Sequence, residues 1–373
     1  MPRDVRILVD YRPALRQGTG VGRYVHEMAS ALAPLLPPES RLRLFSSSWK
    51  DRIDSRSAPA PAVDVRVPVA LLNLVWHRLE WPPVEWVAGP TDIAHSSHPL
   101  LMPTRGGAQV VTVYDLDFLD HPERTRAEIR RDYPRLAGPH ARRADLVVVI
   151  SEYTAAAVRD RLNVDPSRIL VCRPGAPAWA ARQPPAVRGP ILFVGTIEPR
   201  KNLPTLFTAY EQVVSADPQA PPLLLAGGTV EHSAAILEPI ARRPLLRDRV
   251  RHLGYVSDTD RERLYREASI LVLPSFDEGF GMPVVEAMQV GLPVVASARG
   301  ALPEVVGDAG ILVDPASAED LARAIGHLLA DPGARQAYSQ AGRRRAGRFS
   351  WKASAALLLD GYREILARRR RDR

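Results

Sequence analysis

Short apolar runs rich in β-branched residues alternate with longer segments of helical periodicity, and the chain contains two such series. This order is typical of βαβ units, in which helices join parallel strands. In the first series we expect seven strands, at residues 5–10, 42–46, 63–67, 92–95, 109–114, 146–150 and 169–172. In the second we expect six, at residues 191–195, 222–226, 250–253, 269–273, 293–296 and 310–313. The pattern predicts an α/β protein with two doubly wound domains.

A length of 373 residues also favours two domains over a single core. Residues 176–190 contain four prolines and no periodicity, which indicates a linker. We therefore assign residues 1–175 to an N-terminal domain and residues 191–351 to a C-terminal domain. A final helix, over about residues 352–373, has apolar side chains at spacings of three and four and hence one apolar face. The other expected helices cover residues 21–33, 124–136, 151–162, 202–214, 257–268, 283–290, 318–329 and 333–345.

Composition indicates a globular chain, because 46% of the residues are hydrophobic and 25% are charged. No uncharged apolar run approaches the roughly 18 residues of a membrane-spanning helix, and the first ten residues lack the apolar core of a signal peptide. Cys172 is the single cysteine, so an internal disulfide is excluded. We expect a protein of the cytoplasm.

The net charge of +8 is confined to the end of the chain. Residues 343–373 carry eleven basic and three acidic side chains, and the preceding residues are neutral as a body. A neutral body argues against nucleic acid as a partner, although binding of nucleic acid through the tail stays open. Our hypothesis is that the arginine-rich end rests on an anionic membrane, as a peripheral attachment to the inner face of the plasma membrane. A solvated helix end is the alternative.

The segment Pro274–Gly291 carries the strongest chemical signal, since it leaves an expected strand and enters a helix near Met282 or Pro283. Backbone N–H groups at a helix start favour an anion such as phosphate, and here they belong to Phe280, Gly281 and Met282. Glu278 lies in the loop and Glu286 about one turn into the helix. Because a bound phosphate repels carboxylates, we expect the two to bind neutral hydroxyls, such as those of a sugar. The alternative is a capped helix with a solvated Glu286.

A second candidate site follows the strand at residues 191–195 and contains Gly195, Thr196, Arg200 and Lys201. Two cations just before a helix can bind a diphosphate, the guanidinium through two parallel hydrogen bonds and the ammonium as a point charge. The chain has only three lysines among 50 basic residues, which makes the position of Lys201 informative. An exposed basic pair without a ligand is the alternative.

The first domain gives weaker signals. A glycine-rich segment after the first strand, with glycines at 18, 20 and 22, opens a helix. Its spacing differs from the GxGxxG pattern of dinucleotide sites, so both a tight turn and a ligand loop that includes Gly20, Val21 and Gly22 stay open.

Asp115 and Asp117 form a DxD triplet, a pattern that holds a divalent cation in metal-dependent sugar transferases. A loop that caps the strand is the other interpretation, and Asp258 and Asp260 form a second such triplet. The histidines do not have the spacing of metal ligands.

Together these motifs resemble glycosyltransferase family 4, whose retaining enzymes have the GT-B fold and move a sugar from a nucleotide diphosphate sugar to an acceptor. The most specific part is Glu278–Glu286, EGFGMPVVE, which is similar to the family's E-x7-E element. The resemblance covers nearly the whole chain, and its supporting segments are GVGRY at 20–24, SEYT at 151–154, VGT at 194–196, PRKN at 199–202, GLPVVAS at 291–297 and LPEV at 302–305. It implies two Rossmann-like domains that face a central cleft, with the C-terminal helix crossing back onto the first domain.

The resemblance also implies roles for the site residues. Glu278 would contact hydroxyls of the donor sugar and Glu286 the ribose, while Arg200 and Lys201 would hold the diphosphate. The nucleotide-sugar site would further include Gly195, Thr196, Phe280, Gly281 and Met282, with the loop around Val256 at the base. The acceptor side would include the segment at Gly20, Val21 and Gly22, together with Tyr114 and Asp115. Many family members have histidine at the position of Tyr114, so that histidine's role beside the donor sugar is not transferred.

The implied activity is that of a retaining hexosyltransferase in polysaccharide biosynthesis. Mannose from GDP-mannose is our first expectation for the donor, and a saccharide or lipid-linked glycan is expected as the acceptor. A UDP-hexose donor is the alternative; a sugar-nucleotide epimerase, a phosphorylase and a nicotinamide-dependent oxidoreductase are less favoured. We expect no metal and no cofactor, because Arg200 and Lys201 would neutralise the diphosphate.

Overall fold

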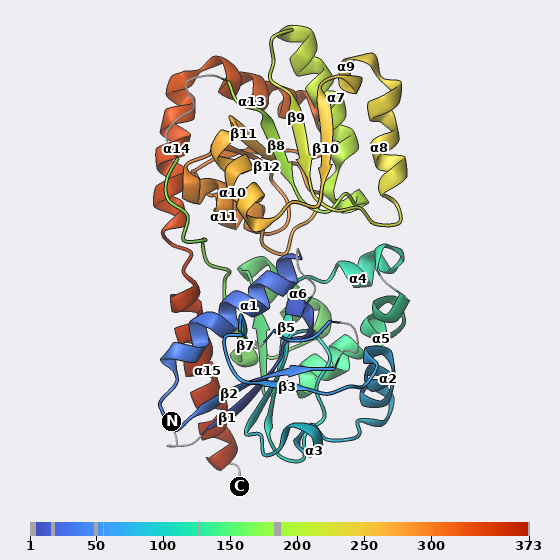
Figure 1. The fold of residues 1–373 in the computed structure, drawn as a ribbon, viewed down its shortest axis with the longest axis vertical. Coiled ribbons are helices and arrows are strands. Elements are labelled where there is room, and N and C mark those ends of the chain that lie inside the picture. Colours follow the sequence, from blue (N-terminus) through green and yellow to red (C-terminus); the bar gives the residue numbers. More distant parts are fainter. Residues whose placement is uncertain are drawn as a thin grey trace. The chain divides into compact units, whose positions relative to one another are not determined.

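The computed structural model describes residues 5–15, 19–47, 51–54, 56–125, 127–182 and 188–371. The chain divides into two compact units, and Figure 1 colours it by position in the sequence. Unit 1 comprises residues 1–174 and 350–373, and unit 2 comprises residues 175–349. Unit 1 is therefore built from both ends of the chain, and unit 2 from one continuous stretch.

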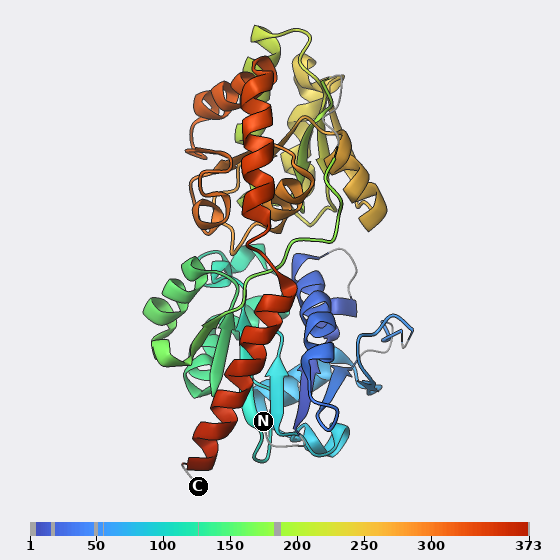
Figure 2. The same ribbon diagram turned by 90° about the vertical axis from the view of Figure 1, so that its left-hand side faces the viewer.

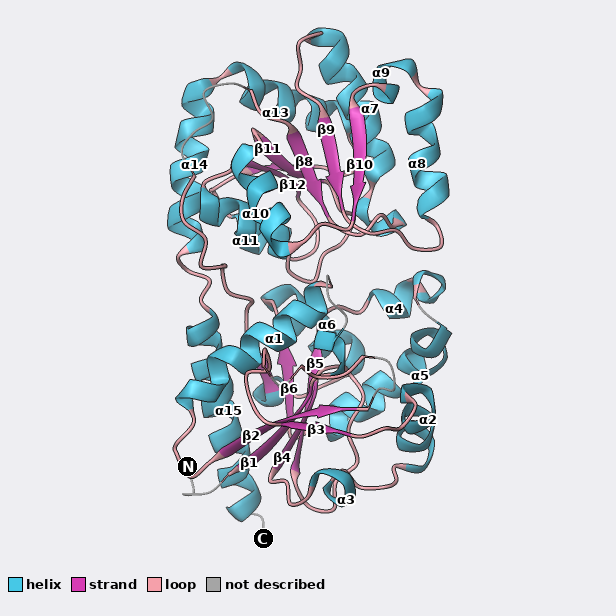
Figure 3. Cartoon of the chain, in the orientation of Figure 1, coloured by secondary structure: helices cyan, strands magenta, loops and turns pink. Residues whose placement is uncertain are grey.

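The sheet of unit 1 has seven strands, all parallel, in the order β3-β2-β1-β4-β5-β6-β7. The strands are β1 (Arg6–Asp10), β2 (Arg41–Ser46), β3 (Ala62–Asp64), β4 (Ile93–Ser96), β5 (Ala108–Val113), β6 (Leu146–Val149) and β7 (Ile169–Val171). The helices are α1 (Gly20–Leu32), α2 (Val69–Leu79), α3 (Glu85–Ala88), α4 (Asp117–Asp120), α5 (Ala127–Arg143), α6 (Glu152–Leu162) and α15 (Trp351–Arg371). Figure 3 shows helices against both faces of the sheet.

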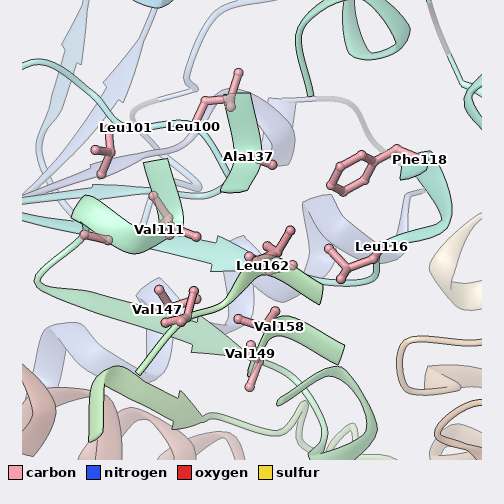
Figure 4. Close-up of a cluster of buried hydrophobic side chains, with 14 residues drawn as sticks. Leu100, Leu101, Val111, Leu116, Phe118, Ala137, Val147, Val149, Val158 and Leu162 are labelled. Atoms are coloured by element: carbon pink, nitrogen blue, oxygen red, sulfur yellow. The ribbon is translucent and has the colours of Figure 1, made fainter. Parts of the chain in front are cut away.

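The main core of unit 1 forms where the valine-rich strands β5 and β6 meet the helices α5 and α6 (Figure 4). Apart from the half-buried Gln109, both strands are buried, as expected for a parallel sheet covered on two faces. The buried side chains here include Val111, Val113, Val147, Val149, Ala137, Ala141, Val158 and Leu162. This core fixes the strand ends that carry Tyr114 and Ser151.

The C-terminal helix α15 packs along α1 within unit 1 (Figure 2). Its buried face includes Ala355, Leu358, Leu359, Tyr362 and Ile365. The hydroxyl of Tyr362 lies 2.5 Å from Nδ1 of His95, whose Nε2 lies 2.8 Å from the hydroxyl of Thr112. Burial lowers the pKa of His95 to about 3, so this histidine is neutral at neutral pH. A polar contact thus joins the end of the chain to the centre of the sheet.

The sheet of unit 2 has six parallel strands in the order β10-β9-β8-β11-β12-β13. Its strands are β8 (Ile191–Val194), β9 (Leu223–Ala226), β10 (Val250–Gly254), β11 (Ile270–Leu273), β12 (Val294–Ser297) and β13 (Ile311–Val313). Its helices are α7 (Leu203–Ala216), α8 (Ser233–Arg242), α9 (Pro244–Arg247), α10 (Asp258–Glu267), α11 (Met282–Val290), α12 (Leu302–Val306), α13 (Ala318–Ala330) and α14 (Pro332–Ala346). The predicted α/β class and the two predicted series of parallel strands are confirmed.

The structure adds contacts and helices that the sequence interpretation does not contain. Residues 176–182, which the proline pattern assigns to a linker, pack on unit 2: the N–H of Ala176 bonds to the carbonyl of Phe349, and that of Arg182 to the carbonyl of Val290. The rest of the expected linker includes residues 183–187, which lie outside the described residues. The structure also contains helices that the pattern does not predict: α2, α8 and the short α3, α4, α9 and α12. Of these, α8 includes Pro239, a residue that normally argues against a helix interior.

Candidate functional site

The strand order of unit 2 reverses at β8, which pairs with β9 on one side and with β11 on the other. In an open parallel sheet, the loops that leave the two strands at such a reversal diverge and leave room for a ligand. Here these loops are Gly195–Asn202 after β8 and Pro274–Gly281 after β11. The two strongest sequence signals therefore lie side by side at one edge of one sheet.

Glu278 is the centre of this edge. Its side chain is only 9% exposed, and its Oε1 accepts hydrogen bonds from Nζ of Lys201 at 2.6 Å and from the hydroxyl of Ser275 at 2.7 Å. Its Oε2 lies 3.4 Å from Nη1 of Arg200, whose Nη2 is 3.0 Å from Glu198. The carboxylate is thus held by both cations that the sequence singles out.

These cations determine the charge state of Glu278. Burial alone would raise the pKa of its carboxyl group, but Lys201 and Arg200 outweigh burial and hold the pKa below its usual value. Glu278 is consequently ionised at neutral pH. Lys201 itself is 8% exposed, so the alternative of an exposed basic pair is excluded.

Backbone contacts fix the loop around Glu278. The amide of Asn202 bonds to the carbonyls of Pro274 and Pro315, at 3.1 and 2.7 Å, and so ties the two loops together. Gly300 has a φ of +60°, and a Cβ at this position would lie 2.6 Å from the backbone nitrogen of Glu278. Only glycine allows this close approach, so the carboxylate sits on a rigid support.

The helix α11 begins at Met282, after Gly281 in the left-handed region with a φ of +98°. A Cβ on Gly281 would meet the side chain of Leu302 at 2.5 Å. Pro283 occupies the first turn, as favoured at a helix start. Phe280 is buried, while Met282 is half-buried. The helix start that the sequence predicts as an anion site is therefore formed beside Glu278.

Glu286 lies one turn into α11 and is 5% exposed, so the alternative of a solvated side chain is excluded. Its Oε2 accepts a hydrogen bond from the hydroxyl of Tyr265 at 2.9 Å. The Nε atom of Arg261 lies 3.4 Å from the same oxygen. Both partners come from α10, which the sequence interpretation does not connect with Glu286.

The other residues of the expected donor site lie at the same edge of the sheet. Gly195 and Thr196 follow β8 directly and are half-buried. Val256, also half-buried, lies in the loop between β10 and α10. Sequence reasoning missed Ser275, Asn202, Tyr265 and Arg261. The first two stand within the noted motifs, whereas no local pattern signals the two α10 residues, which contact Glu286 only through the packing of one helix on another.

In unit 1, Gly20 and Gly22 belong to the first turn of α1, with Val21 half-buried between them. The hydroxyl of Thr19 caps this helix by accepting from the N–H of Gly22 at 3.0 Å. The preceding part of the glycine-rich segment, residues 16–18, lies outside the described residues. The structure therefore shows a capped helix start at Gly20–Gly22.

The loop after β5 holds Tyr114 and Asp115. The ring of Tyr114 packs edge-on against Tyr24, and its buried hydroxyl has no hydrogen-bond partner among the described residues. Burial raises the pKa of Tyr114 well above its usual value, so the hydroxyl stays protonated. Asp115 accepts from the N–H of Asp117 at 3.2 Å, a local turn that caps the strand end.

The strand order of unit 1 also reverses, at β1, which pairs with β2 and β4. Asp10 at the end of β1 is fully buried and accepts two hydrogen bonds from the guanidinium of Arg12, at 2.8 and 2.7 Å, and one from the Arg12 backbone N–H at 3.1 Å. His98, after β4, lies 3.2 Å from the same carboxylate. Burial would raise the pKa of Asp10, but Arg12 and His98 hold it well below its usual value.

Within the described parts of the chain, no group of three or more His, Cys, Asp or Glu side chains is placed to hold a metal ion. Likewise, none of the described helices combines the length and apolar character of a membrane span.

Comparison with known proteins gives matches over most of the chain. A model of Glycosyltransferase Family 4 matches residues 18–178, and a model of Glycosyl transferases group 1 matches residues 184–345. O-antigen chain mannosyltransferase B of Escherichia coli is 28% identical over 96% of this chain and 99% of that protein.

Solved structures with a similar fold include sucrose-phosphate synthase from Thermosynechococcus elongatus, with a TM-score of 0.77 and 23% identity, over 97% of this chain and 99% of that one. Anabaena HepE in complex with UDP and glucose has a TM-score of 0.73 and 18% identity, over 95% of this chain and 98% of that one. These likenesses give the fold, and the family matches give the class of enzyme. The chain is accordingly a glycosyltransferase of the family 4 type with the GT-B fold.

Proposed function

We propose that this enzyme transfers a hexose, with retention of anomeric configuration, from a nucleotide diphosphate sugar to a saccharide or lipid-linked glycan. The observation that carries the proposal is the group of Lys201, Arg200 and Glu278 beside the start of α11, at the strand reversal of unit 2. Two cations and a helix start suit a diphosphate, and a fixed carboxylate suits the hydroxyls of the sugar. Mannose from GDP-mannose is the first candidate, which the mannosyltransferase relative supports.

In the proposed reaction, the bond between the anomeric carbon and the diphosphate oxygen breaks, and the acceptor oxygen bonds to that carbon on the same face. The electron pair of the broken bond goes to the diphosphate, which then accepts the proton of the acceptor hydroxyl. Negative charge grows on the diphosphate in the transition state, so Lys201, Arg200 and the N–H groups of α11 stabilise it. Glu278 orients the sugar. Its own contacts with Ser275 and both cations hold it in place before the donor arrives.

The donor is tested by titrating the full chain calorimetrically with GDP, UDP, ADP and NAD. We expect GDP to bind most tightly. Preferential binding of NAD would contradict the glycosyltransferase proposal and favour the oxidoreductase. The second candidate donor is a UDP-hexose, which the fold likeness to the UDP-bound Anabaena protein suggests. Tighter binding of UDP than of GDP would replace the first candidate by the second.

We further propose that transfer needs no metal and no cofactor, because Lys201 and Arg200 supply positive charge where a divalent cation would otherwise act. Sugar transfer in the presence of EDTA should equal transfer without it. Activity that disappears with EDTA and returns with Mn²⁺ would contradict this part of the proposal and leave the donor assignment untouched.

A peripheral attachment to an anionic membrane is the last part of the proposal. Arg369 is tied to Asp145 at 2.9 Å and to the carbonyl of Gly106, while Arg370 and Arg371 are exposed. The adjacent loop places Arg105 over the ring of Trp86 at 5.1 Å, and Trp86 is 54% exposed. Exposed arginines next to an exposed aromatic ring suit a surface of anionic headgroups.

Vesicle sedimentation tests this attachment. The chain should sediment with vesicles of phosphatidylglycerol and phosphatidylcholine but less with phosphatidylcholine alone, and replacing Arg370 and Arg371 by serine should weaken binding. Sedimentation that is independent of anionic lipid would favour the solvated helix end.

A further inference from the structure

Residues 176–182, the entry segment of unit 2, form hydrogen bonds with α11. The amide of Gln289, on α11, donates to the carbonyl of Trp179 at 2.8 Å. Three residues further on, the N–H of Arg182 donates to the carbonyl of Val290 at 2.9 Å. These contacts hold the Trp179 backbone beside the helix that carries Glu286.

The half-buried ring of Trp179 packs on the two α10 residues that contact Glu286. The guanidinium carbon of Arg261 lies 5.4 Å from the centre of this ring, which is a cation–π contact. The ring of Tyr265 lies 5.7 Å from it, measured between centroids. Figure 1 shows α10 and α11 side by side, as the contacts of Arg261 and Tyr265 with Glu286 require.

Arg261 is nearly buried, with 10% of its side chain exposed, and its Nη1 is held by Asp258 at 2.8 Å. Its Nε faces Glu286 Oε2 at 3.4 Å but makes no hydrogen bond among the described residues. The guanidinium is therefore placed by Asp258 at one end and by the face of Trp179, and its charge stabilises the buried carboxylate of Glu286.

We propose that Trp179 and Arg261 are positioning residues for Glu286, and that the entry segment of unit 2 thereby contributes to recognition of the ribose. This inference rests on the proposed function, in which Glu286 binds the ribose of the donor. A carboxylate has about four lone-pair sites. Glu286, whose Oε2 is held by α10, can therefore also accept hydrogen bonds from the adjacent hydroxyls of a ribose. The orientation of Glu286 depends on Arg261, and the place of Arg261 depends on Trp179.

The experiment compares GDP with 2′,3′-dideoxy-GDP, which lacks both ribose hydroxyls, by calorimetric titration of the full chain. Hydrogen bonds to a charged group should make the wild type prefer GDP by roughly tenfold or more. Arg261→Leu should remove most of this preference without changing the affinity for the dideoxy nucleotide. Trp179→Leu should reduce it by about threefold, and Arg261→Lys should retain part of it. Arg263→Leu is the matched control, since Arg263 is an exposed arginine of the same helix, and it should leave the preference unchanged.

Fluorescence gives an independent readout, because Trp179 is the one tryptophan of the sequence between residues 175 and 349. Binding of GDP should change the emission of the wild type, and Trp179→Phe should abolish most of that change.

The outcomes distinguish failure of the positioning role from failure of the proposed function. If neither GDP nor UDP binds, the proposed function fails. If UDP binds in place of GDP, the same comparison is made with UDP and its 2′,3′-dideoxy form. If the nucleotide binds but Arg261→Leu and Trp179→Leu keep the full ribose preference, the positioning role is wrong and the proposed function stands. Should Arg261→Leu fail to fold, Arg261→Lys and Trp179→Leu decide in the same way.

Discussion

The strand order reverses at β1 in unit 1 and at β8 in unit 2, and both sites contain a buried carboxylate with an arginine. The two carboxylates differ in the groups that surround them and their cationic partners. In unit 1, Asp10 is paired with Arg12, whose guanidinium also lies over the rings of Trp76 and Phe45 at 5.6 and 5.7 Å. In unit 2, Glu278 is paired with Lys201 and Arg200, which stand beside a helix start and a glycine-supported loop.

The difference shows how one topology can be used in two ways. The Asp10 pair is enclosed by aromatic rings and contributes to the interior of unit 1, where breaking a buried pair is costly. The Glu278 pair stands beside the start of α11, where the proposed diphosphate would bind Lys201 and Arg200. Chemistry is therefore expected at the edge of unit 2, and stability at the edge of unit 1.

The largest expected effect concerns Lys201. Lys201→Ala should lower kcat/KM for the donor by roughly 10² or more, which is the scale of losing a preorganised electrostatic group. Lys352→Ala is the matched control, because Lys352 is an exposed lysine of α15 in unit 1 and should leave kcat/KM unchanged. Equal kinetics for the two variants would remove Lys201 from the site and erase the contrast between the two edges.

A second test uses pH, because the three buried histidines, His77, His95 and His140, all belong to unit 1. Burial lowers the pKa of His95 to about 3 and those of His77 and His140 to about 4. In the unfolded chain each titrates near 6.5, so below that pH the unfolded chain binds protons that the folded unit does not. The stability they contribute is complete above pH 6.5 and falls as the pH is lowered toward 4, by about 1.4 kcal/mol per pH unit for each histidine.

Hydrogen exchange measured for each unit at pH 7.5 and 5.5, with correction for intrinsic rates, checks this expectation. Unit 1 should lose protection at the lower pH more than unit 2. His95→Gln should make the pH dependence of unit 1 shallower. Equal loss in both units would show that the buried histidines do not distinguish them.

The smallest expected effect concerns Tyr114, whose buried hydroxyl has no partner among the described residues. An unpaired buried polar group costs about 1–3 kcal/mol, so Tyr114→Phe should raise the free energy of unfolding by about 1 kcal/mol in urea denaturation without ligands. Tyr24→Phe is the matched control with the opposite sign, because the Tyr24 hydroxyl donates to the carbonyl of Cys172 at 2.9 Å. Destabilisation by both variants would mean that Tyr114 is satisfied in solution.

The sequence predicts those parts of the site whose residues are close in the chain. Glu278 and its helix start share one motif, and Lys201 lies between a recognisable strand and helix, so strand–loop–helix order was enough to find them. Arg261 and Tyr265 reach Glu286 only because α10 packs on α11, and His98 reaches Asp10 only because β4 pairs with β1. Such contacts depend on tertiary packing, which single-sequence periodicity does not contain.

The same reason explains the segment at 176–182. Its single proline, Pro177, and its lack of periodicity correctly indicate neither helix nor strand, but they say nothing about whether the extended chain is anchored. The anchors are the carbonyls of Val290 and Phe349 and the amide of Gln289, more than 100 residues further along the chain.

The contact of Tyr362 with His95 joins residues that are 267 positions apart. During synthesis on the ribosome, every strand of unit 1 is made long before α15, whereas unit 2 has all its strands and helices once residue 349 has emerged. Unit 2 can therefore complete its fold while unit 1 still exposes the surface that awaits α15. Because domains generally fold as units, the half of the enzyme translated second is expected to mature first.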